Sequence, residues 1–398
     1  MMAKKRILAV LSIVAILLAA TLAGCSSSGP APADQGKSDT KAPSEIKIGF
    51  VTDLSVGGAT EQGVATKQGF ELAVKEFNAA GGYNGTPVKL ITYDDEAKPE
   101  KAVELVTRLI NQDKVLAIAG FVNSGNALAS EQLTQDAKVP MLVNFATATA
   151  ITTKFQDQPK NYIFRYSLLD SEQVSIILDW AKTKNFKKIA ILHDTSGYGV
   201  SGKEDVLKQM AARGMKAAAI DTLNVNDTDM TPQLQKFKKA GIDAVFLYNL
   251  SPENANVIRS AQKIDYKPTF FGSWSISFGT FKRLAGDLRN GVYTSTSYVV
   301  GQTEKSKALH DKMVKEYSDD VLPIASAFGY DSANLLLQAL KTAGPNSEKI
   351  RDALENMESF DGAVGKINKP FSPKDHEGIG LDQIFMAVWE NGELKKVK

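Results

Sequence analysis

The chain has 398 residues, with 47 lysines and arginines against 45 aspartates and glutamates, and it contains one cysteine. A balance so near neutrality, without a block of basic side chains, excludes a protein that binds nucleic acid by neutralising a run of phosphates. A single cysteine excludes disulfides within the chain, so the 43% of hydrophobic residues must supply stability through packed cores.

Residues 1–24 have the pattern of a secretory leader. Three basic residues at positions 4–6 precede an apolar stretch at 7–20, and small residues follow it. This order predicts a lipoprotein signal peptide rather than a membrane-spanning helix. The sequence Leu22-Ala23-Gly24-Cys25 resembles a bacterial lipobox, which implies cleavage before Cys25 and a lipid on that cysteine. An ordinary signal peptide with an incidental cysteine is the alternative.

Residues 25–44 follow the expected cleavage point and are rich in Ser, Pro, Ala, Gly and Lys. They contain almost nothing apolar to bury, so we expect a flexible linker after the lipidated Cys25. About 350 residues remain from Glu45 onward, which is too many for one ordinary core and predicts two lobes.

The first part of the folded region alternates short apolar runs with helical patterns. One helix is predicted around Phe70 and Phe77, which lie on one apolar stripe, and a second begins near Pro99, because proline is favoured in a first turn. The predicted strands are residues 46–51, 88–93, 115–119 and 140–144. Strands that alternate with helices indicate a parallel sheet covered on both faces.

The same alternation begins again near residue 163. Asp170 is expected to cap a helix, with Gln173 in the reciprocal position of a capping box. Thr231-Pro232 and Ser251-Pro252 indicate helices that start with a hydroxyl cap followed by proline. The further predicted strands are 163–167, 188–192, 216–220 and 244–248, and the helices between them are 200–212, 232–240 and 252–264. The two halves therefore predict two similar doubly wound domains.

After residue 292 the pattern changes, and the remaining elements do not form a third alternating domain. They are strand-like runs at 293–300 and 383–390 and helices at 305–317, 328–343 and 347–357. We expect them to complete the two earlier sheets, so that the chain crosses between the lobes more than once and forms a hinge. The predicted fold class is α/β, with two doubly wound parallel-sheet lobes joined by a multi-crossover hinge. The predicted N-terminal lobe is 45–165 with 296–375, and the predicted C-terminal lobe is 166–295 with 376–398.

Two loops that follow strands of the first lobe are candidate binding loops, because ligands of open parallel sheets bind beyond the carboxyl ends of the strands. Residues 120–125 open a helix and present the Ser124 hydroxyl beside free backbone N–H groups, which suits a carboxylate. Residues 144–147 follow the next strand and end in Thr147. Serine and threonine also cap helices, so each loop alone has a purely structural alternative.

A dinucleotide-binding site is the main alternative to a carboxylate-binding site. Residues 197–202 match G-x-G-x-x-G, with Asp221 about 20 residues further on. However, residues 194–196 lengthen a turn that such a site needs to be tight, and the motif lies in the second lobe. We therefore expect no cofactor.

No catalytic or metal site is predicted. The chain has no G-x-S-x-G motif, and His193, His310 and His376 lie too far apart for ligand spacing. The acidic residues 94–96 are explained by a charged turn before a helix N-terminus. Without a nucleophile beside a base, we expect a protein that is not an enzyme.

Taken together, these residues resemble the leucine/isoleucine/valine-binding family of ABC-importer solute-binding proteins, which have the type I periplasmic binding protein fold. The resemblance spans essentially residues 46–397. Its most specific stretches are 70–85, 93–96, 120–125, 163–166, 198–199 and 243–246. It implies a two-lobed protein with three crossovers that closes on a small solute and delivers it to a membrane permease.

The resemblance also implies site residues. In the family a serine, a backbone group and a threonine hold the solute's carboxylate, and these positions fall on Ser124, Phe145 and Thr147. A tyrosine that covers the ligand from the second lobe falls on Tyr198, and an aromatic position of the first lobe falls on Gln62.

Two positions depart from the family. The acidic residue that pairs with the ammonium of leucine falls on Trp274, and a nearby tyrosine falls on Leu250. A buried ammonium without a partner costs on the order of several kcal/mol, so one hypothesis is a small carboxylate without an ammonium, aromatic or branched. The other is a branched-chain amino acid, with Asp170 or Glu253 supplying the pairing charge.

The expected partners are the solute, ABC permease subunits and, through the lipid on Cys25, a membrane. We expect an extracytoplasmic, monomeric receptor. A tethered sensor of the same fold remains the alternative to an importer component.

Overall fold

The computed structural model describes residues 45–55, 59–318 and 322–397. The expected signal peptide, Cys25 and the linker to residue 44 lie outside the described residues. Within the described ranges, no helix combines the length and apolar character that crossing a bilayer requires.

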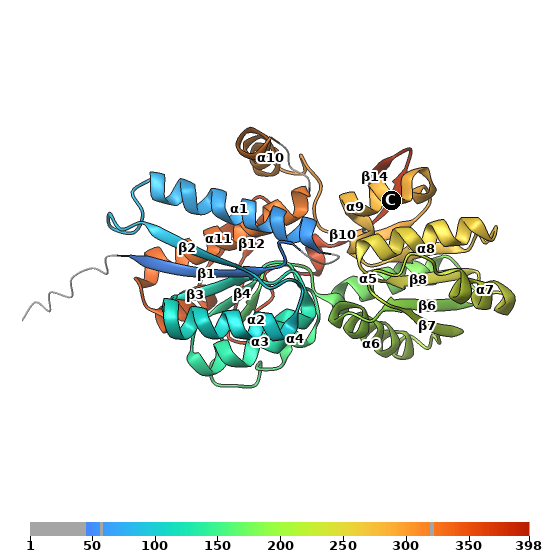
Figure 1. The fold of residues 1–398 in the computed structure, drawn as a ribbon, viewed down its shortest axis with the longest axis horizontal. Coiled ribbons are helices and arrows are strands. Elements are labelled where there is room, and N and C mark those ends of the chain that lie inside the picture. Colours follow the sequence, from blue (N-terminus) through green and yellow to red (C-terminus); the bar gives the residue numbers. More distant parts are fainter. Residues whose placement is uncertain (1–44, 56–58, 319–321, 398) are drawn as a thin grey trace, which may run out of the picture. The chain divides into compact units, whose positions relative to one another are not determined.

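The first lobe is built on a five-stranded parallel sheet in the order β2-β1-β3-β4-β5 (Figure 1). Its strands are β1 (Ile46–Thr52), β2 (Val88–Asp94), β3 (Ala117–Gly120), β4 (Met141–Val143) and β5 (Ile163–Arg165). Helix α1 (Thr60–Ala79) packs on one face, and helices α2 (Pro99–Arg108) and α3 (Ser124–Ala137) pack on the other. Successive residues of a strand point to opposite faces, so Phe50 joins the core under α1, whereas Val51 joins the core under α2 and α3.

The second lobe is built on a seven-stranded sheet in the order β14-β13-β10-β9-β8-β6-β7. Strands β6 to β10 run parallel, and β13 and β14 add an antiparallel edge. The strands are β6 (Ile189–Asp194), β7 (Ala219–Leu223), β8 (Ala244–Tyr248), β9 (Thr269–Gly272), β10 (Tyr293–Thr296), β13 (Phe385–Glu390) and β14 (Glu393–Lys396). The helices are α5 (Asp170–Thr183), α6 (Gly197–Ala212), α7 (Thr231–Ala240), α8 (Ser251–Lys263) and α9 (Gly279–Ala285).

The late part of the chain contributes to both lobes but completes only one of the two sheets, contrary to expectation. Strands β10, β13 and β14 join the second sheet, whereas no described strand after β5 joins the first, and the short strands within residues 359–368 pair only with each other. After β10 it returns to the first lobe, where α11 (Pro323–Ala343) lies along α1, and it then supplies β13 and β14 to the second sheet. The remaining elements are η1 (Leu109–Asp113), α4 (Ala150–Thr153), η2 (Trp274–Ser277), η3 (Gly286–Arg289), α10 (Glu304–Tyr317), α12 (Ser347–Glu355), β11 (Ser359–Asp361), β12 (Lys366–Asn368) and η4 (Leu381–Gln383). The α/β fold class is confirmed, and the lobe boundaries in residue numbers stay predictions.

Several elements differ from expectation. Strand β9 was not predicted, α11 begins at Pro323 rather than at residue 328, and β10 ends at Thr296 rather than at residue 300. One further strand and three helix caps also differ. The strand expected at 216–220 is β7, which begins at Ala219, because it is an edge strand whose register is set by parallel pairing with β6. Asp170, Thr231 and Ser251 are the first residues of their helices rather than hydroxyl or carboxylate caps. The expected capping box is absent, because the Asp170 carboxylate accepts from the Gln173 side chain instead of from a backbone amide (3.3 Å).

A buried ion pair ties the end of β5 to the last crossing between the lobes. The Arg165 side chain is fully buried and donates from Nε and Nη2 to the Glu377 carboxylate, at 2.7 and 2.6 Å. Arg165 also donates to the carbonyl of Ala148 (2.8 Å) and the hydroxyl of Thr152 (3.0 Å). All of these bonds are charge-assisted, and the bidentate pair fixes the geometry of two segments far apart in sequence.

Glu377→Gln should lower the free energy of unfolding by about 3 kcal/mol, because it removes the only carboxylate charge that is hydrogen-bonded to the buried guanidinium among the described residues. Urea unfolding measures this change. Asp311→Asn is the matched control, since Asp311 pairs with Lys307 on the surface (2.7 Å) and its loss should cost less than about 0.5 kcal/mol. Equal stabilities of the two variants would contradict the role of the buried pair.

Candidate ligand-binding site

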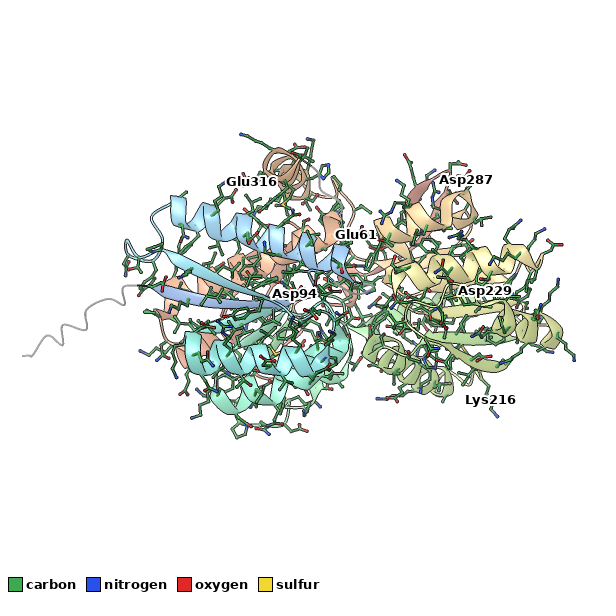
Figure 2. The ribbon with its side chains drawn as sticks, viewed as in Figure 1. Glu61, Asp94, Lys216, Asp229, Asp287 and Glu316 are labelled. Atoms are coloured by element: carbon green, nitrogen blue, oxygen red, sulfur yellow. The ribbon has the colours of Figure 1, made fainter. Side chains whose placement is uncertain are left out.

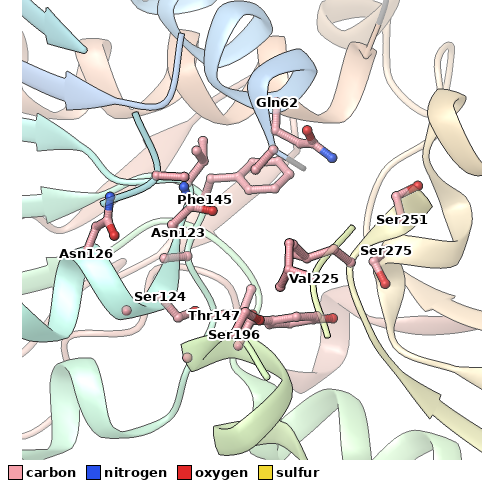
Figure 3. A pocket seen from close by; sticks show the side chains of 18 of the residues that line it. Gln62, Asn123, Ser124, Asn126, Phe145, Thr147, Ser196, Val225, Ser251 and Ser275 are labelled. Carbon is pink, nitrogen blue, oxygen red and sulfur yellow. The ribbon is translucent and has the colours of Figure 1, made fainter. Parts of the chain in front are cut away.

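A cavity of about 440 Å³ lies where the carboxyl ends of the two sheets face each other, and residues of both lobes line it (Figure 3). The structure brings all seven residues expected from the sequence into its wall. They are Gln62 in α1, Ser124 at the start of α3, Phe145 and Thr147 after β4, Tyr198 in α6, Leu250 before α8 and Trp274 after β9. Their roles in binding stay predictions.

The first lobe lines the cavity with donors suited to an anion. The Ser124 hydroxyl accepts from the amide of Ala148 (3.3 Å), which leaves its own proton for another acceptor. Within the described part of the chain, the backbone amides of Ser124, Gly125, Phe145 and Thr147 have no hydrogen-bond acceptor, and all four residues line the cavity. Neutral N–H and O–H donors at a helix N-terminus are a favourable setting for a carboxylate.

Aromatic rings form the apolar part of the wall. The Phe145 and Trp274 rings lie 4.5 Å apart between centroids, and Phe278 packs edge-on against Trp274 at 5.0 Å. Trp274 is only 2% exposed and therefore rigidly held by its neighbours. Such flat, fixed surfaces fit a planar or branched apolar body.

Charged groups are nearly absent from the wall. Glu96 is the only carboxylate among the described residues that line the cavity, and no lysine or arginine lines it there. Glu96 is itself paired with Lys98 (2.8 Å) and Lys101 (2.5 Å), and these side-chain bonds lower the pKa of its carboxyl. An ammonium in the cavity would therefore meet no unpaired carboxylate from the described wall.

The two acids weighed as alternative partners for an ammonium do not line the cavity. The Glu253 carboxylate is buried and accepts from the amide of Asn226 (2.7 Å). Asp170 is also fully buried, directly behind Thr147, whose carbonyl accepts from the Asp170 amide (3.0 Å). Burial raises the pKa of Asp170 to about 7, and the hydroxyls of Thr147 and Tyr248 oppose that rise.

The sequence did not indicate where the lobes contact each other. Gly125 of α3 and Gly197 of α6 meet so closely that a Cβ on Gly197 would lie 2.8 Å from the Cα of Gly125. Glu61 of α1 also pairs with Arg283 of α9 (3.3 Å). Figure 2 shows Glu61 at the end of α1 nearest the second lobe. The lobes are thus apposed, and the missing side chain of Gly197 permits this approach, whereas a Cβ on Gly125 would make only ordinary contacts at 3.8–3.9 Å.

Sequence reasoning also missed part of the wall. Phe278 follows the short helix η2 and had no distinguishing pattern. Ser251 was expected only to start a helix, and Ser275 was not singled out. The G-x-G-x-x-G run at 197–202 does not form the strand-to-helix turn, because all six of its residues lie within α6, which Ser196 caps with its side chain. Asp194, expected in a lengthened turn, is the last residue of β6, and only residues 195–196 connect the strand to the helix.

Comparisons with known proteins agree with this geometry. A family model described as "Periplasmic binding protein" matches residues 45–393, so the chain belongs to the periplasmic binding protein family. A leucine-, isoleucine-, valine-, threonine- and alanine-binding protein of Pseudomonas aeruginosa is 28% identical over 324 residues, which cover 81% of this chain and 85% of the relative.

Two solved structures show similar folds with bound solutes. The branched-chain amino acid transporter substrate-binding protein LivJ of Streptococcus pneumoniae, in complex with isoleucine, is 26% identical with a TM-score of 0.77 and covers 88% of this chain and 97% of its own. A solute-binding protein of an ABC transporter from Rhodopseudomonas palustris BisB5, in complex with 3,4-dihydroxybenzoic acid, is 25% identical with a TM-score of 0.76, covering 89% and 96%. This family resemblance, and the type I fold expected from it, are therefore confirmed.

Gly197→Ala should hold the lobes apart, because the added methyl group would collide with the backbone of Gly125. Small-angle X-ray scattering, with a saturating solute chosen by a thermal-shift screen of carboxylates, should give a larger radius of gyration than the wild type. Val200→Ala, an exposed change in the same helix, should leave the radius unchanged. Identical scattering of Gly197→Ala and wild type would show that this contact does not limit closure.

The free energy of unfolding should fall as the pH rises from about 4 to about 7, in part because of Asp170. Its pKa is about 7 in the folded protein against 3.8 in the unfolded chain, so the folded state binds more protons across this window. Asp170→Asn should make the free energy of unfolding depend less steeply on pH between about 4 and about 7, by at most about 1.4 kcal/mol per pH unit. Urea unfolding at several pH values tests this, with Asp311→Asn as the exposed control; an unchanged slope in Asp170→Asn would contradict the assignment.

Proposed function

We propose that the protein is an extracytoplasmic solute-binding component of an ABC importer, which captures a small organic carboxylate between its lobes. The observation that carries this proposal is the set of unpartnered donors at one end of the cavity, namely the Ser124 hydroxyl and the amides of Ser124, Gly125, Phe145 and Thr147. A carboxylate offers acceptors to several of these donors at once, and each charge-assisted bond is stronger than a neutral one.

The solute that fits best has an apolar body and no ammonium. Phe145, Trp274 and Phe278 provide the apolar surface, and the only described carboxylate of the wall is already paired with two lysines. The position at which an acid is expected from the family resemblance holds Trp274. The similarity to the Rhodopseudomonas palustris protein, solved with 3,4-dihydroxybenzoic acid, is consistent with an aromatic acid.

A branched-chain amino acid is the second candidate, and the names of the relatives favour it. The Pseudomonas aeruginosa protein and LivJ are described as binding or carrying such amino acids. In this chain an ammonium would require Asp170 or Glu253 to turn into the cavity, at the cost of the bonds that hold them now.

Binding and closure are coupled in the proposed mechanism. The solute first meets the donors of the lobe assigned to residues 45–165 and 296–375. The lobe of residues 166–295 and 376–398 then brings Tyr198, Leu250 and Trp274 over it. Contacts made only in the closed form shift the equilibrium toward that form. The closed surface is what the permease recognises.

Residues 1–24 are proposed to direct export, and Cys25 to carry the lipid that holds the protein at the membrane, with residues 25–44 as the spacer. We propose a monomer that works with permease subunits, without a cofactor, a metal or nucleic acid. A tethered sensor is distinguished by gene neighbourhood, since permease and ATPase genes beside this gene favour import.

Ser124→Ala should weaken binding of 4-methylpentanoate by about 1–3 kcal/mol, because one charge-assisted hydrogen bond to the carboxylate is lost. Isothermal calorimetry measures this, and leucine, which differs from 4-methylpentanoate by its ammonium, is titrated in parallel. We expect the wild type to bind 4-methylpentanoate more tightly than leucine.

Ser347→Ala is the control for that experiment, since Ser347 also begins a helix, α12, but lies outside the cavity. Its affinity should equal that of the wild type. Micromolar binding of leucine, isoleucine or valine would contradict a solute without an ammonium and would favour the second candidate, a branched-chain amino acid. Unchanged affinity in Ser124→Ala would place the carboxylate elsewhere.

A further inference from the structure

Two polar contacts join the lobes outside the cavity. In the first, the Glu61 carboxylate of α1 accepts from the Thr280 hydroxyl and from Nη2 of Arg283 (3.3 Å), which both belong to α9. In the second, the Thr149 hydroxyl, after β4, donates to the Asp205 carboxylate of α6 (2.7 Å). None of these five residues lines the cavity.

The two contacts lie beside different parts of the cavity wall. Glu61 is followed in α1 by Gln62, which lines the cavity, and Thr149 lies two residues after Thr147, which also lines it. Figure 3 shows Gln62 and Thr147 well apart on the wall. Separation of α9 from α1, and of α6 from the loop after β4, would break both contacts, so they exist only while the lobes are apposed.

The first contact places a carboxylate where water has little access. The Glu61 side chain is 15% exposed, whereas that of Arg283 is 61% exposed, and Arg283 also donates to the Thr280 hydroxyl (3.2 Å). Burial raises the pKa of the Glu61 carboxyl, and the bond and charge of Arg283 oppose that rise. The cost of desolvating Glu61 is therefore offset by its partners from the other lobe.

Contacts of this kind act on closure and not on the solute. The apparent affinity for a solute that requires the closed form is proportional to the fraction of the protein able to adopt that form. Because none of the five residues lines the cavity, their contribution to affinity should be the same for every solute. Ser124 and Trp274, which line it, act through the solute itself.

We propose that Glu61, Thr280 and Arg283 form a latch that stabilises the closed form, and that the Thr149–Asp205 bond is a second latch. All five are positioning residues, which set the overall affinity without selecting among solutes. This inference rests on the proposed function, since it takes solute binding to require closed lobes.

Calorimetry with 4-methylpentanoate and benzoate on the full chain tests the first latch. Arg283→Met should weaken binding of both acids by about 10-fold, because closure then buries the Glu61 carboxylate without the cation that is bonded to it. The ratio of the two affinities should stay within about twofold of the wild-type ratio. Lys282→Met, an exposed change in the same helix, should leave both affinities unchanged.

A double-mutant cycle separates the latch from a merely structural effect. In a Glu61→Gln background, Arg283→Met should change the affinity by less than about twofold, because the charge that requires a partner is gone. Thr149→Val tests the second latch and should weaken both acids by an equal factor. That factor should multiply with the effect of Arg283→Met, since the two contacts share no residue.

Two results would overturn the first latch and leave the proposed function intact. One is binding that depends on Ser124 but is unchanged in Arg283→Met, and the other is a loss that persists undiminished in the Glu61→Gln background. A changed preference between the two acids would also overturn it, since it would indicate direct contact with the solute. Unchanged affinity in Thr149→Val would overturn the second latch. Failure of both acids to bind, or binding indifferent to Ser124→Ala, would remove the proposed function and the inference together.

Discussion

A carboxylate that leaves water must recover its hydrogen bonds, and the cavity supplies them from neutral donors of the first lobe. The Ser124 hydroxyl and the amides after β3 and β4 converge there, while no lysine or arginine lines the described wall. The second lobe contributes aromatic and aliphatic side chains, including Tyr198, Leu250 and Trp274, beside polar residues such as Ser196 and Asn226. In the proposed mechanism the anion-binding loops and the covering residues lie on different sheets, because capture needs donors that are exposed in the open form and closure needs surfaces that exclude water.

The segments that cross between the lobes connect the two halves of the proposed site. The buried pair of Arg165 and Glu377 ties the end of β5 to the last crossing, so the hinge segments are held by strong local bonds rather than by the solute. The lobes can then meet at a small contact, Gly125 against Gly197, without a side chain between them. Asp170 lies immediately behind Thr147, and burial raises the pKa of its carboxyl to about 7, a rise that the Thr147 hydroxyl opposes.

Much of this could be predicted from the sequence, because parallel sheets bring their carboxyl ends together. The loops at 120–125 and 144–147 were therefore expected to be neighbours, and the structure places Ser124 and Thr147 on one wall. Features that depend on contacts distant in sequence could not be foreseen. The register of β7 follows from β6, Phe278 enters the cavity from a short irregular segment, and the Arg165–Glu377 pair joins residues 212 positions apart. Asp170 and Ser251 carried signals for helix starts, but the fold decides what surrounds their side chains. The Asp170 carboxyl interacts with the hydroxyls of Thr147 and Tyr248, and the Ser251 hydroxyl is buried without a hydrogen-bond partner among the described residues.

The most direct measurement is a crystal structure of the protein with its bound solute. A carboxylate within hydrogen-bond distance of the Ser124 hydroxyl and of the amides of Phe145 and Thr147, with the lobes closed over an apolar body against Trp274, is the expected result. A solute bound elsewhere, or one whose ammonium rather than carboxylate faces Ser124, would contradict the anion site on which the proposed function depends.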